Sequence, residues 1–276
     1  MIAALPRLHA VTDDRVARIE GLPRLVAAMA AEAGAALAVH LRTRTLPAGT
    51  LLALARELGA ALAPHGAWLV VNDRADVARV ALARAVVSGR TGLGVADVRR
   101  VAPSALVGRS VHDAAEIRAA AAEGSDFLVA GSVFATASHP QGPVAGLDVV
   151  RAAAATGRPV LAIGGLTPAR ASDAVLAGAW GVAAIRALWD AADPAAAVRD
   201  FLAALPRDGT IALVVNGEAR QARRGLTLAQ LLDDLALDPR AVVVEHNRRI
   251  VRRDALAATP VDEGDAIELV HFVGGG

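Results

Sequence analysis

The sequence predicts an α/β protein in two parts: a (β/α)8 barrel over residues 1–205 and, after a linker at 206–209, a small β-grasp domain over 210–276. Two observations lead to this prediction. Short β-rich apolar runs alternate with alanine-rich runs of helical period as far as about residue 186, which is typical of repeated strand–helix units. After residue 209 the pattern changes to a hairpin, one amphipathic helix and further strands. The two patterns predict two different folds in one chain.

Eight candidate strands can be counted in the first part, at residues 8–13, 35–42, 68–73, 85–89, 106–111, 127–134, 159–165 and 181–186. Eight parallel strands separated by helices fit a closed barrel, whose active site lies where the C-terminal ends of the strands meet the following loops. Polar residues and one glycine stand at or just past these ends: Asp13, Arg42, Asn72, Asp73, Ser110, His112, Thr136 and Gly165. We therefore expect the site at this end of the barrel.

The second part begins with two alternating runs around Asn216-Gly217, the dipeptide that most strongly indicates a two-residue hairpin turn. The amphipathic segment LTLAQLLDDLAL follows, with Thr227 as its expected N-cap. AVVVEHNRRIV supplies further strand, and a turn at 262–264 leads into a last strand. This order of elements predicts a ubiquitin-like β-grasp fold.

Composition excludes several classes of function. The formal net charge is +1, which does not indicate a nucleic-acid or acidic-membrane partner. The absence of cysteine excludes disulfides and a cysteine nucleophile, and the absence of lysine excludes Schiff-base chemistry. The N-terminus has no basic region ahead of an apolar stretch, and no uncharged apolar run is long enough to span a bilayer. We expect a soluble cytoplasmic protein.

The second part carries VVNGE near its start, the LTLAQLLDDL helix, VVVEHNRRIV, DEGDAIELV and a final Gly-Gly. In this combination it resembles the thiamine sulfur-carrier family. The resemblance implies that Gly276, preceded by Gly275, is adenylated by an E1-like partner enzyme and converted to a thiocarboxylate, which then gives sulfur to thiazole synthase. Glycine suits this role because a chain without Cβ can pass through a narrow channel. The molybdopterin sulfur carrier shares this ending, and the fused barrel favours the thiamine carrier.

The barrel part carries HLRTRT (40–45), VVNDRADVA (70–78), VGRSVHDAAE (107–116), AGSVFATASHPQGPVAGLD (130–148) and PVLAIGGLTP (159–168). These segments resemble the family that holds thiamine phosphate synthase and thiazole tautomerase. The synthase pattern implies magnesium held by two aspartates; Asp73 matches one, and the segment 85–94 offers no carboxylate for the other. In the synthase motif Gln-Leu-Arg-x-Lys the lysine is replaced by Arg44, and the lysine of a Thr-x-Thr-Lys loop is replaced by His139. These departures favour proton transfer over diphosphate displacement.

We therefore expect a thiazole tautomerase without cofactor or metal, fused to a sulfur carrier. Two alternatives stay open: a thiamine phosphate synthase with magnesium at Asp73, and an inactive barrel that only accompanies the carrier. The candidate acid/base is His139. His40 and Ser132 are further candidates, because His40 shares a strand face with Arg42 and Ser132 stands where some tautomerases have a histidine. Packing or loop capping is the competing interpretation of these side chains.

The expected ligand is a small thiazole phosphate, and the resemblance implies which residues bind it. Glycines after the seventh strand and the start of the following helices would hold the phosphate, since backbone amides at helix starts attract anions. A second copy of the chain is a further expected partner. The residues expected to contact the substrate are Arg42, Arg44, Asn72, Ser110, Thr136, Ser138, Gly164, Gly165, Ile185 and Arg186.

Overall fold

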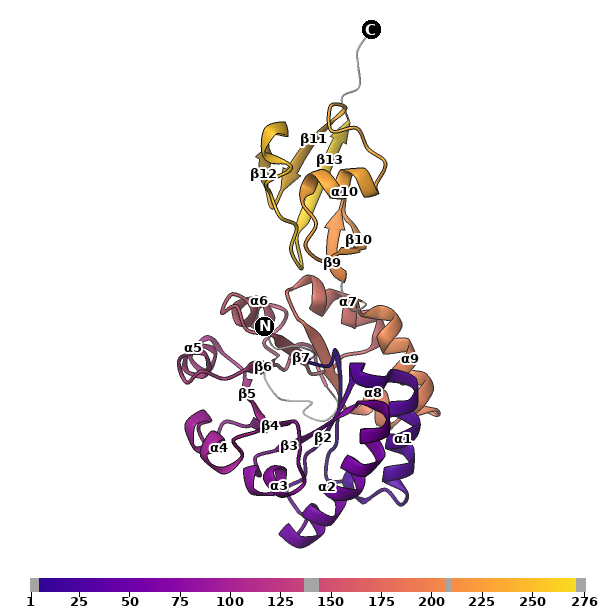
Figure 1. Cartoon of the computed structure of the whole chain (residues 1–276), viewed down its shortest axis with the longest axis vertical. Coiled ribbons are helices and arrows are strands. Elements are labelled where there is room, and N and C mark those ends of the chain that lie inside the picture. The colour runs from indigo at the N-terminus through magenta and orange to yellow at the C-terminus, as the bar shows by residue number, and fades with distance from the viewer. Residues whose placement is uncertain (1–4, 137–143, 207–209, 272–276) are drawn as a thin grey trace. The chain divides into compact units, whose positions relative to one another are not determined.

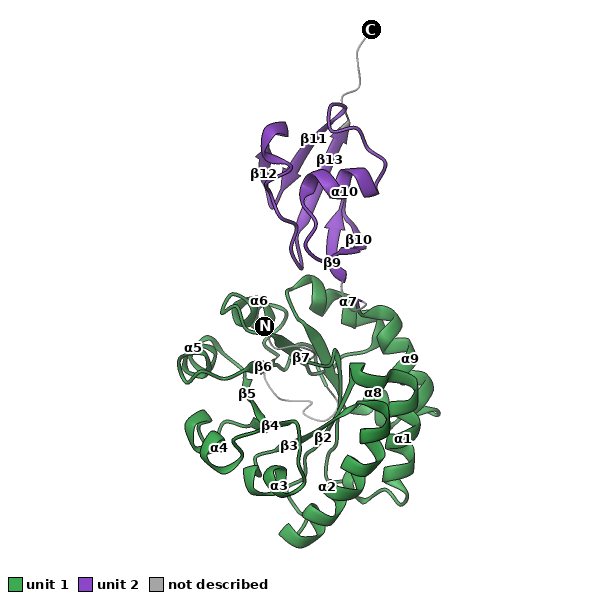
Figure 2. Ribbon diagram, in the orientation of Figure 1, with its two compact units in different colours: residues 1–205 green, residues 206–276 purple. Residues whose placement is uncertain are grey.

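The computed structural model describes residues 5–136, 144–206 and 210–271, and the chain divides into two compact units, residues 1–205 and 206–276 (Figures 1 and 2). Four of the predicted site residues lie outside the described residues and receive no structural account: Ser138, His139, Gly275 and Gly276.

The predicted barrel is confirmed in unit 1. Eight parallel strands close in the order β1 to β8, and the helices lie outside the ring of strands (Figure 1). The strands are β1 (Leu8–Val11), β2 (Leu37–Leu41), β3 (Trp68–Asn72), β4 (Ala85–Ser88), β5 (Leu106–Val111), β6 (Phe127–Ala130), β7 (Val160–Ile163) and β8 (Gly181–Ala184). The helices are α1 (Leu22–Ala33), α2 (Ala48–Leu62), α3 (Ala75–Val80), α4 (Val95–Val101), α5 (Ala114–Ala122), α6 (Asp148–Ala154), α7 (Pro168–Leu176), α8 (Arg186–Trp189) and α9 (Pro194–Ala204).

The barrel interior is filled by alternate residues of the strands, because successive side chains of a strand point to opposite faces. Val70, Val87, Phe127 and Leu161 belong to this buried interior cluster. Gly108 makes room for the largest of these side chains, since a Cβ built there would lie 2.5 Å from two ring atoms of Phe127. The interior is therefore a packed core, and open space begins only at the ends of the strands.

Most strands end earlier than the sequence predicts, and the difference is largest for β6, which ends at Ala130 rather than at residue 134. The chain beyond β6 passes very close to the end of β7: a Cβ on Gly131 would lie 2.2 Å from the carbonyl oxygen of Ile163. Backbone bonds still join the two segments, from Val133 N to Ile163 O (2.9 Å) and from Phe134 N to Gly164 O (3.0 Å). The residues after β6 thus form part of the site rather than a regular strand.

Unit 2 is a five-stranded sheet of order β10-β9-β13-β11-β12 with one α-helix in the described part of this unit, α10 (Leu228–Asp234). The parallel pair β9–β13 lies at the centre of the sheet, and leucines of α10 belong to the same buried core as the strands. Thr227 caps α10 as predicted, in a capping box with Gln230. The strands are β9 (Thr210–Val215), β10 (Glu218–Arg223), β11 (Val242–His246), β12 (Arg249–Val251) and β13 (Ala266–His271).

Two turns set the register of this sheet. The hairpin β9–β10 turns at Asn216-Gly217, as predicted, and the Asn216 side chain accepts a hydrogen bond from Leu269 N at 2.6 Å. The segment AVVVEHNRRIV is not one strand but the hairpin β11–β12, because Asn247 and Arg248 adopt positive φ angles of 50° and 65°. Positive φ at both central residues is the geometry that reverses a chain within two residues.

No helix in the described ranges of the chain combines the length and the apolar character needed to cross a membrane.

Candidate active site

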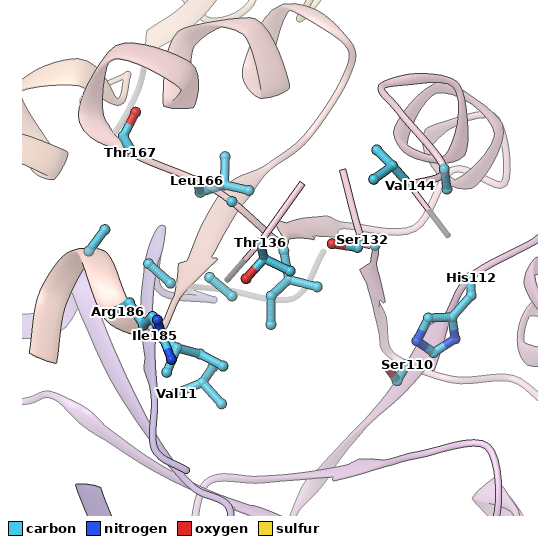
Figure 3. A pocket seen from close by; sticks show the side chains of 18 of the residues that line it. Val11, Ser110, His112, Ser132, Thr136, Val144, Leu166, Thr167, Ile185 and Arg186 are labelled. Atoms are coloured by element: carbon cyan, nitrogen blue, oxygen red, sulfur yellow. The ribbon is translucent and has the colours of Figure 1, made fainter. Parts of the chain in front are cut away.

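A cavity of about 660 Å³ opens at the C-terminal ends of the barrel strands, where the sequence predicts the site. Its lining comes from the ends of β1, β2, β5, β6, β7 and β8 and from the segments that follow them. In Figure 3, Ser110 and His112 lie on one side, Ile185 and Arg186 on the opposite side, and Ser132 and Thr136 between them. Seven of the predicted substrate residues line the cavity, together with Ser132: Arg42, Ser110, Thr136, Gly164, Gly165, Ile185 and Arg186.

One wall of the cavity is made by backbone in close approach. Gly164 and Gly165 follow β7 with φ angles of +105° and +63°, a region that side chains rarely allow. A Cβ on Gly164 would lie 2.2 Å from Ser132 Oγ, and one on Gly165 would lie 2.5 Å from the carbonyl oxygen of Ala135. Two independent constraints therefore require glycine at each position, and the wall presents peptide groups rather than side chains to a ligand.

The Arg42 backbone is held in place at the end of β2. The buried hydroxyl of Thr12 accepts a hydrogen bond from Arg42 N (2.8 Å) and donates one to Arg42 O (2.9 Å). Asp14 fixes the residues that follow, because its carboxylate accepts bonds from the Thr43 hydroxyl and from the amide of Arg44. These bonds lower the pKa of the Asp14 carboxyl to about 2. Asp14 therefore stays ionised near neutral pH and keeps this loop anchored.

Arg44 itself is exposed and does not line the cavity. The presence of arginine instead of the synthase lysine at position 44 therefore does not change the wall of the cavity. Arg186 is different, because it lines the cavity at the start of α8.

Two predicted residues, His40 and Asn72, point into the barrel but do not line the cavity. His40 is 1% exposed, and its Nε2 lies 2.7 Å from Nδ1 of His9, which is fully buried. Burial lowers the pKa of the His40 imidazole to about 4. The imidazole of His40 is therefore enclosed in the barrel interior and does not face the cavity. The sequence offered no signal for His9 as its partner.

His112 is a cavity residue that we noted at a strand end without assigning it to the site. It follows β5, is exposed, and its Nδ1 lies 2.9 Å from a carboxylate oxygen of Glu116, one turn along α5. Glu116 also accepts a hydrogen bond from the backbone amide of His112, at 2.8 Å. The same carboxylate therefore holds both the ring and the backbone of His112 at the cavity rim. In the sequence, the position of His112 directly after a predicted strand is the feature that indicates a site residue.

The residues around Asp73 do not fit a magnesium site built from two carboxylates. Asp73 Oδ1 accepts a hydrogen bond from Gly89 N at 2.7 Å. The segment that should bring the second aspartate brings Gly92 instead, so close that a Cβ there would lie 2.7 Å from Asp73 Oδ1. Within the described ranges, no three His, Cys, Asp or Glu side chains gather in a metal-binding group. Mg²⁺ prefers several oxygen ligands in octahedral geometry. Asp73 is a single carboxylate and does not provide such a set of ligands.

The chain is thus a (β/α)8 barrel with a cavity at the C-terminal ends of its strands, joined to a ubiquitin-like β-grasp domain. The chain belongs to the thiamine monophosphate synthase family, which residues 8–188 match, and residues 213–276 match the ThiS family. The predicted resemblance of both parts is thereby confirmed.

Several relatives are synthases by name. The thiamine-phosphate synthase of Methanoculleus marisnigri is 39% identical over 208 residues, which cover 73% of this chain and 98% of that protein. The bifunctional protein ThiM/ThiE of Symbiobacterium thermophilum is 42% identical over 167 residues, 59% of this chain but only 35% of that longer protein. The structure of thiamine phosphate pyrophosphorylase from Pyrococcus furiosus matches with a TM-score of 0.63 and 28% identity, covering 72% of this chain and 94% of that one.

These comparisons overturn the preference for a tautomerase, an isomerase, because the relatives are named as synthases, which are transferases. That preference depended on single replacements. One of them, Arg44, lies outside the cavity, whereas the family match extends over all eight strands. Thiamine biosynthesis, a synthase-type barrel and a ThiS domain are what the comparisons support.

Proposed function

We propose that unit 1 is a thiamine phosphate synthase, which joins a pyrimidine diphosphate to a thiazole phosphate, and that unit 2 is a sulfur carrier. The observation that carries the first half is the match to the synthase of M. marisnigri over 98% of that protein's length. The family match at 8–188 includes every strand whose end lines the cavity. The matched region therefore includes the cavity.

The reaction asks the site to separate charge. The bond between the pyrimidine methylene carbon and the diphosphate oxygen breaks, and its electron pair leaves with the diphosphate. The lone pair of the thiazole nitrogen forms the new carbon–nitrogen bond, which leaves a positive thiazolium ring. An enzyme accelerates such a step by placing fixed charges and dipoles where charge develops in the transition state.

This chain's own residues suit that task. We assign the thiazole phosphate to the glycine wall at Gly164 and Gly165, beside Arg186, since a barrel of this kind commonly binds phosphate after its seventh and eighth strands. Arg42, whose backbone is held by Thr12, is assigned to the leaving diphosphate. A guanidinium stays charged at all relevant pH values and can bond phosphate oxygens in pairs. Because the residues at Asp73 do not fit a magnesium site, no step here depends on that ion.

The test is direct synthesis. Purified full-length chain is given the pyrimidine diphosphate and the thiazole phosphate, and release of diphosphate and formation of thiamine phosphate are both followed. We expect the two products in equal amounts. Replacement of Arg42 by Ala should lower kcat/KM by about 100-fold, because charged hydrogen bonds to a transition state contribute roughly 2–3 kcal/mol. Replacement of Arg24, an exposed residue of α1, serves as the matched control. Absence of both products from the wild-type chain would refute the synthase.

The second half of the proposal rests on the ThiS match, which extends to residue 276. We assign Gly276 as the residue whose carboxylate becomes the thiocarboxylate, with an adenylating enzyme and thiazole synthase as partners. Mass spectrometry of the chain, after incubation with ATP, a sulfur source and an adenylating partner, should show one oxygen replaced by sulfur. A chain lacking Gly275 and Gly276 should show no replacement and should retain synthase activity. Retention of the mass change in that truncated chain would contradict the assignment.

A further inference from the structure

Two imidazoles form a polar line through the otherwise apolar interior of the barrel. His9 of β1 and His40 of β2 are 0% and 1% exposed, and their rings meet edge to face with centroids 5.0 Å apart. His9 Nε2 lies 2.9 Å from the carbonyl oxygen of Pro6, and His9 Nδ1 lies 2.7 Å from His40 Nε2. At the other end, His40 Nδ1 lies 3.3 Å from the side-chain amide of Asn72, at the Oδ1 position. The contacts form one unbroken chain.

The order of protons along this chain follows from its first member. A carbonyl oxygen can only accept, so His9 Nε2 must carry the proton that meets Pro6. A neutral imidazole has one N–H, which makes His9 Nδ1 an acceptor and His40 Nε2 the donor to it. The remaining nitrogen of His40, Nδ1, is then an acceptor. The NH2 group of Asn72 must therefore face His40 Nδ1. This assignment rotates the planar amide by half a turn, so that its nitrogen and oxygen exchange positions.

Both imidazoles are neutral near pH 7, as this argument requires. Burial lowers the pKa of His40 to about 4, and burial together with the neighbouring His40 holds the pKa of His9 well below its ordinary value. Charging either ring would leave an uncompensated cation in an apolar core, because their neighbours inside the barrel include Ala38 and Val70.

Asn72 is the least buried member of the chain of contacts. It is half-buried at the C-terminal end of β3, two residues beyond the inward-facing Val70 and beside Val87 of β4. In the described part of the chain, the contact with His40 is the only hydrogen bond of its side chain. The second atom of the amide therefore has no hydrogen-bond partner among the described residues.

We propose that His9 and His40 are positioning residues that turn the Asn72 amide so that its NH2 meets His40 and its carbonyl oxygen faces the barrel mouth. Asn72 then presents an acceptor, and it selects a substrate that carries an N–H or O–H at that point. Only the activity arm of the test rests on the proposed synthase.

The decisive measurement is ¹⁵N NMR of the imidazole nitrogens in the full chain at pH 7.5, with histidine labelling. The shifts of Nδ1 and Nε2 distinguish the two neutral tautomers, and the variants His9→Gln and His40→Gln assign the signals among the seven histidines. We expect the Nε2–H tautomer for both rings. Replacement of Asn72 by Asp removes the donor and puts a carboxylate beside His40 Nδ1. Because His40 Nε2 must still donate to His9, we expect His40 to become doubly protonated in this variant, with the ¹⁵N shifts of both ring nitrogens in the N–H range. An Nδ1–H tautomer of His40 in the wild-type chain, or an unprotonated His40 Nδ1 in the Asp variant, overturns the proposal.

The activity arm separates positioning from packing. His40→Leu keeps the volume but removes both hydrogen bonds, and we expect its KM for the pyrimidine diphosphate to rise about tenfold, with kcat little changed. His40→Gln restores the donor and the acceptor and should return KM to within about twofold of wild type. A glutamine variant as impaired as the leucine variant contradicts the positioning role. If the wild-type chain makes no thiamine phosphate, the synthase fails while the NMR arm still decides the amide orientation.

Discussion

Acidification should destabilise the barrel through its buried imidazoles in a pH window where few other groups act. The pKa of His40 is lowered from 6.5 to about 4 by burial, so below pH 6.5 protons bind the unfolded chain before the folded one. The free energy of unfolding should therefore fall as pH decreases from 6.5 to about 4, and this contribution should level off below pH 4. At about 1.4 kcal/mol per pH unit, this interval lowers the free energy of unfolding by about 3.5 kcal/mol. His9 acts in the same direction.

The Asp14 carboxyl does not obscure this window. The Asp14 carboxyl, whose pKa is lowered from 3.8 to about 2, stabilises the folded state above pH 4 and loses that effect only as pH falls towards 2. Acid-induced loss of stability between pH 6.5 and 4 consequently reports histidines rather than this aspartate.

The assay is urea unfolding followed by tryptophan fluorescence at a series of pH values. All three tryptophans, Trp68, Trp180 and Trp189, belong to unit 1, so the signal reports the barrel and not the β-grasp unit. The variant His40→Gln should flatten the decline, and His65→Gln, at the half-buried His65 outside the chain of contacts, should leave it in place. Equal slopes for wild type and His40→Gln would refute the reasoning.

Three further expectations concern packing and capping. Gly108→Ala should lower the free energy of unfolding of the barrel by about 1–3 kcal/mol in the same assay, since its Cβ meets the ring of Phe127 at 2.5 Å; an unchanged urea midpoint would contradict this close packing. Gly164→Ala should abolish most synthase activity, because both its φ of +105° and the contact with Ser132 Oγ at 2.2 Å oppose a side chain; wild-type kcat/KM in that variant would remove the glycine wall from the site. Thr227→Ala should destabilise unit 2 by about 1 kcal/mol through loss of the N-cap of α10, with Thr227→Ser close to wild type; hydrogen exchange of the α10 amides measures it, and equal protection in both variants would exclude the cap.

The barrel and its site could be predicted because both depend on local patterns. Alternation of strand and helix runs fixes the order of elements, and the polar residues after strands β2, β5 and β6 reach the cavity because parallel strands end together. Contacts between segments that lie far apart in the sequence could not be predicted. The pairing of His9 with His40 joins residues 31 apart in sequence, and nothing in either segment alone indicates that their rings meet. The early end of β6 likewise follows from contact with β7 rather than from its own apolar run.

The error about the reaction has a related cause. A missing residue in a motif was weighed as a missing function, although the consequence of a replacement depends on what surrounds it. At the place of the second aspartate, Gly92 packs against Asp73, and Gly89 N already bonds the Asp73 carboxylate. The local backbone is therefore built around a single carboxylate. In a chain with no lysine, the positive charge at the cavity comes from arginines such as Arg42 and Arg186. A synthase built in this way would bind its diphosphate with the Arg42 guanidinium and its thiazole phosphate beside Arg186, since the planar donors of a guanidinium bond phosphate in pairs.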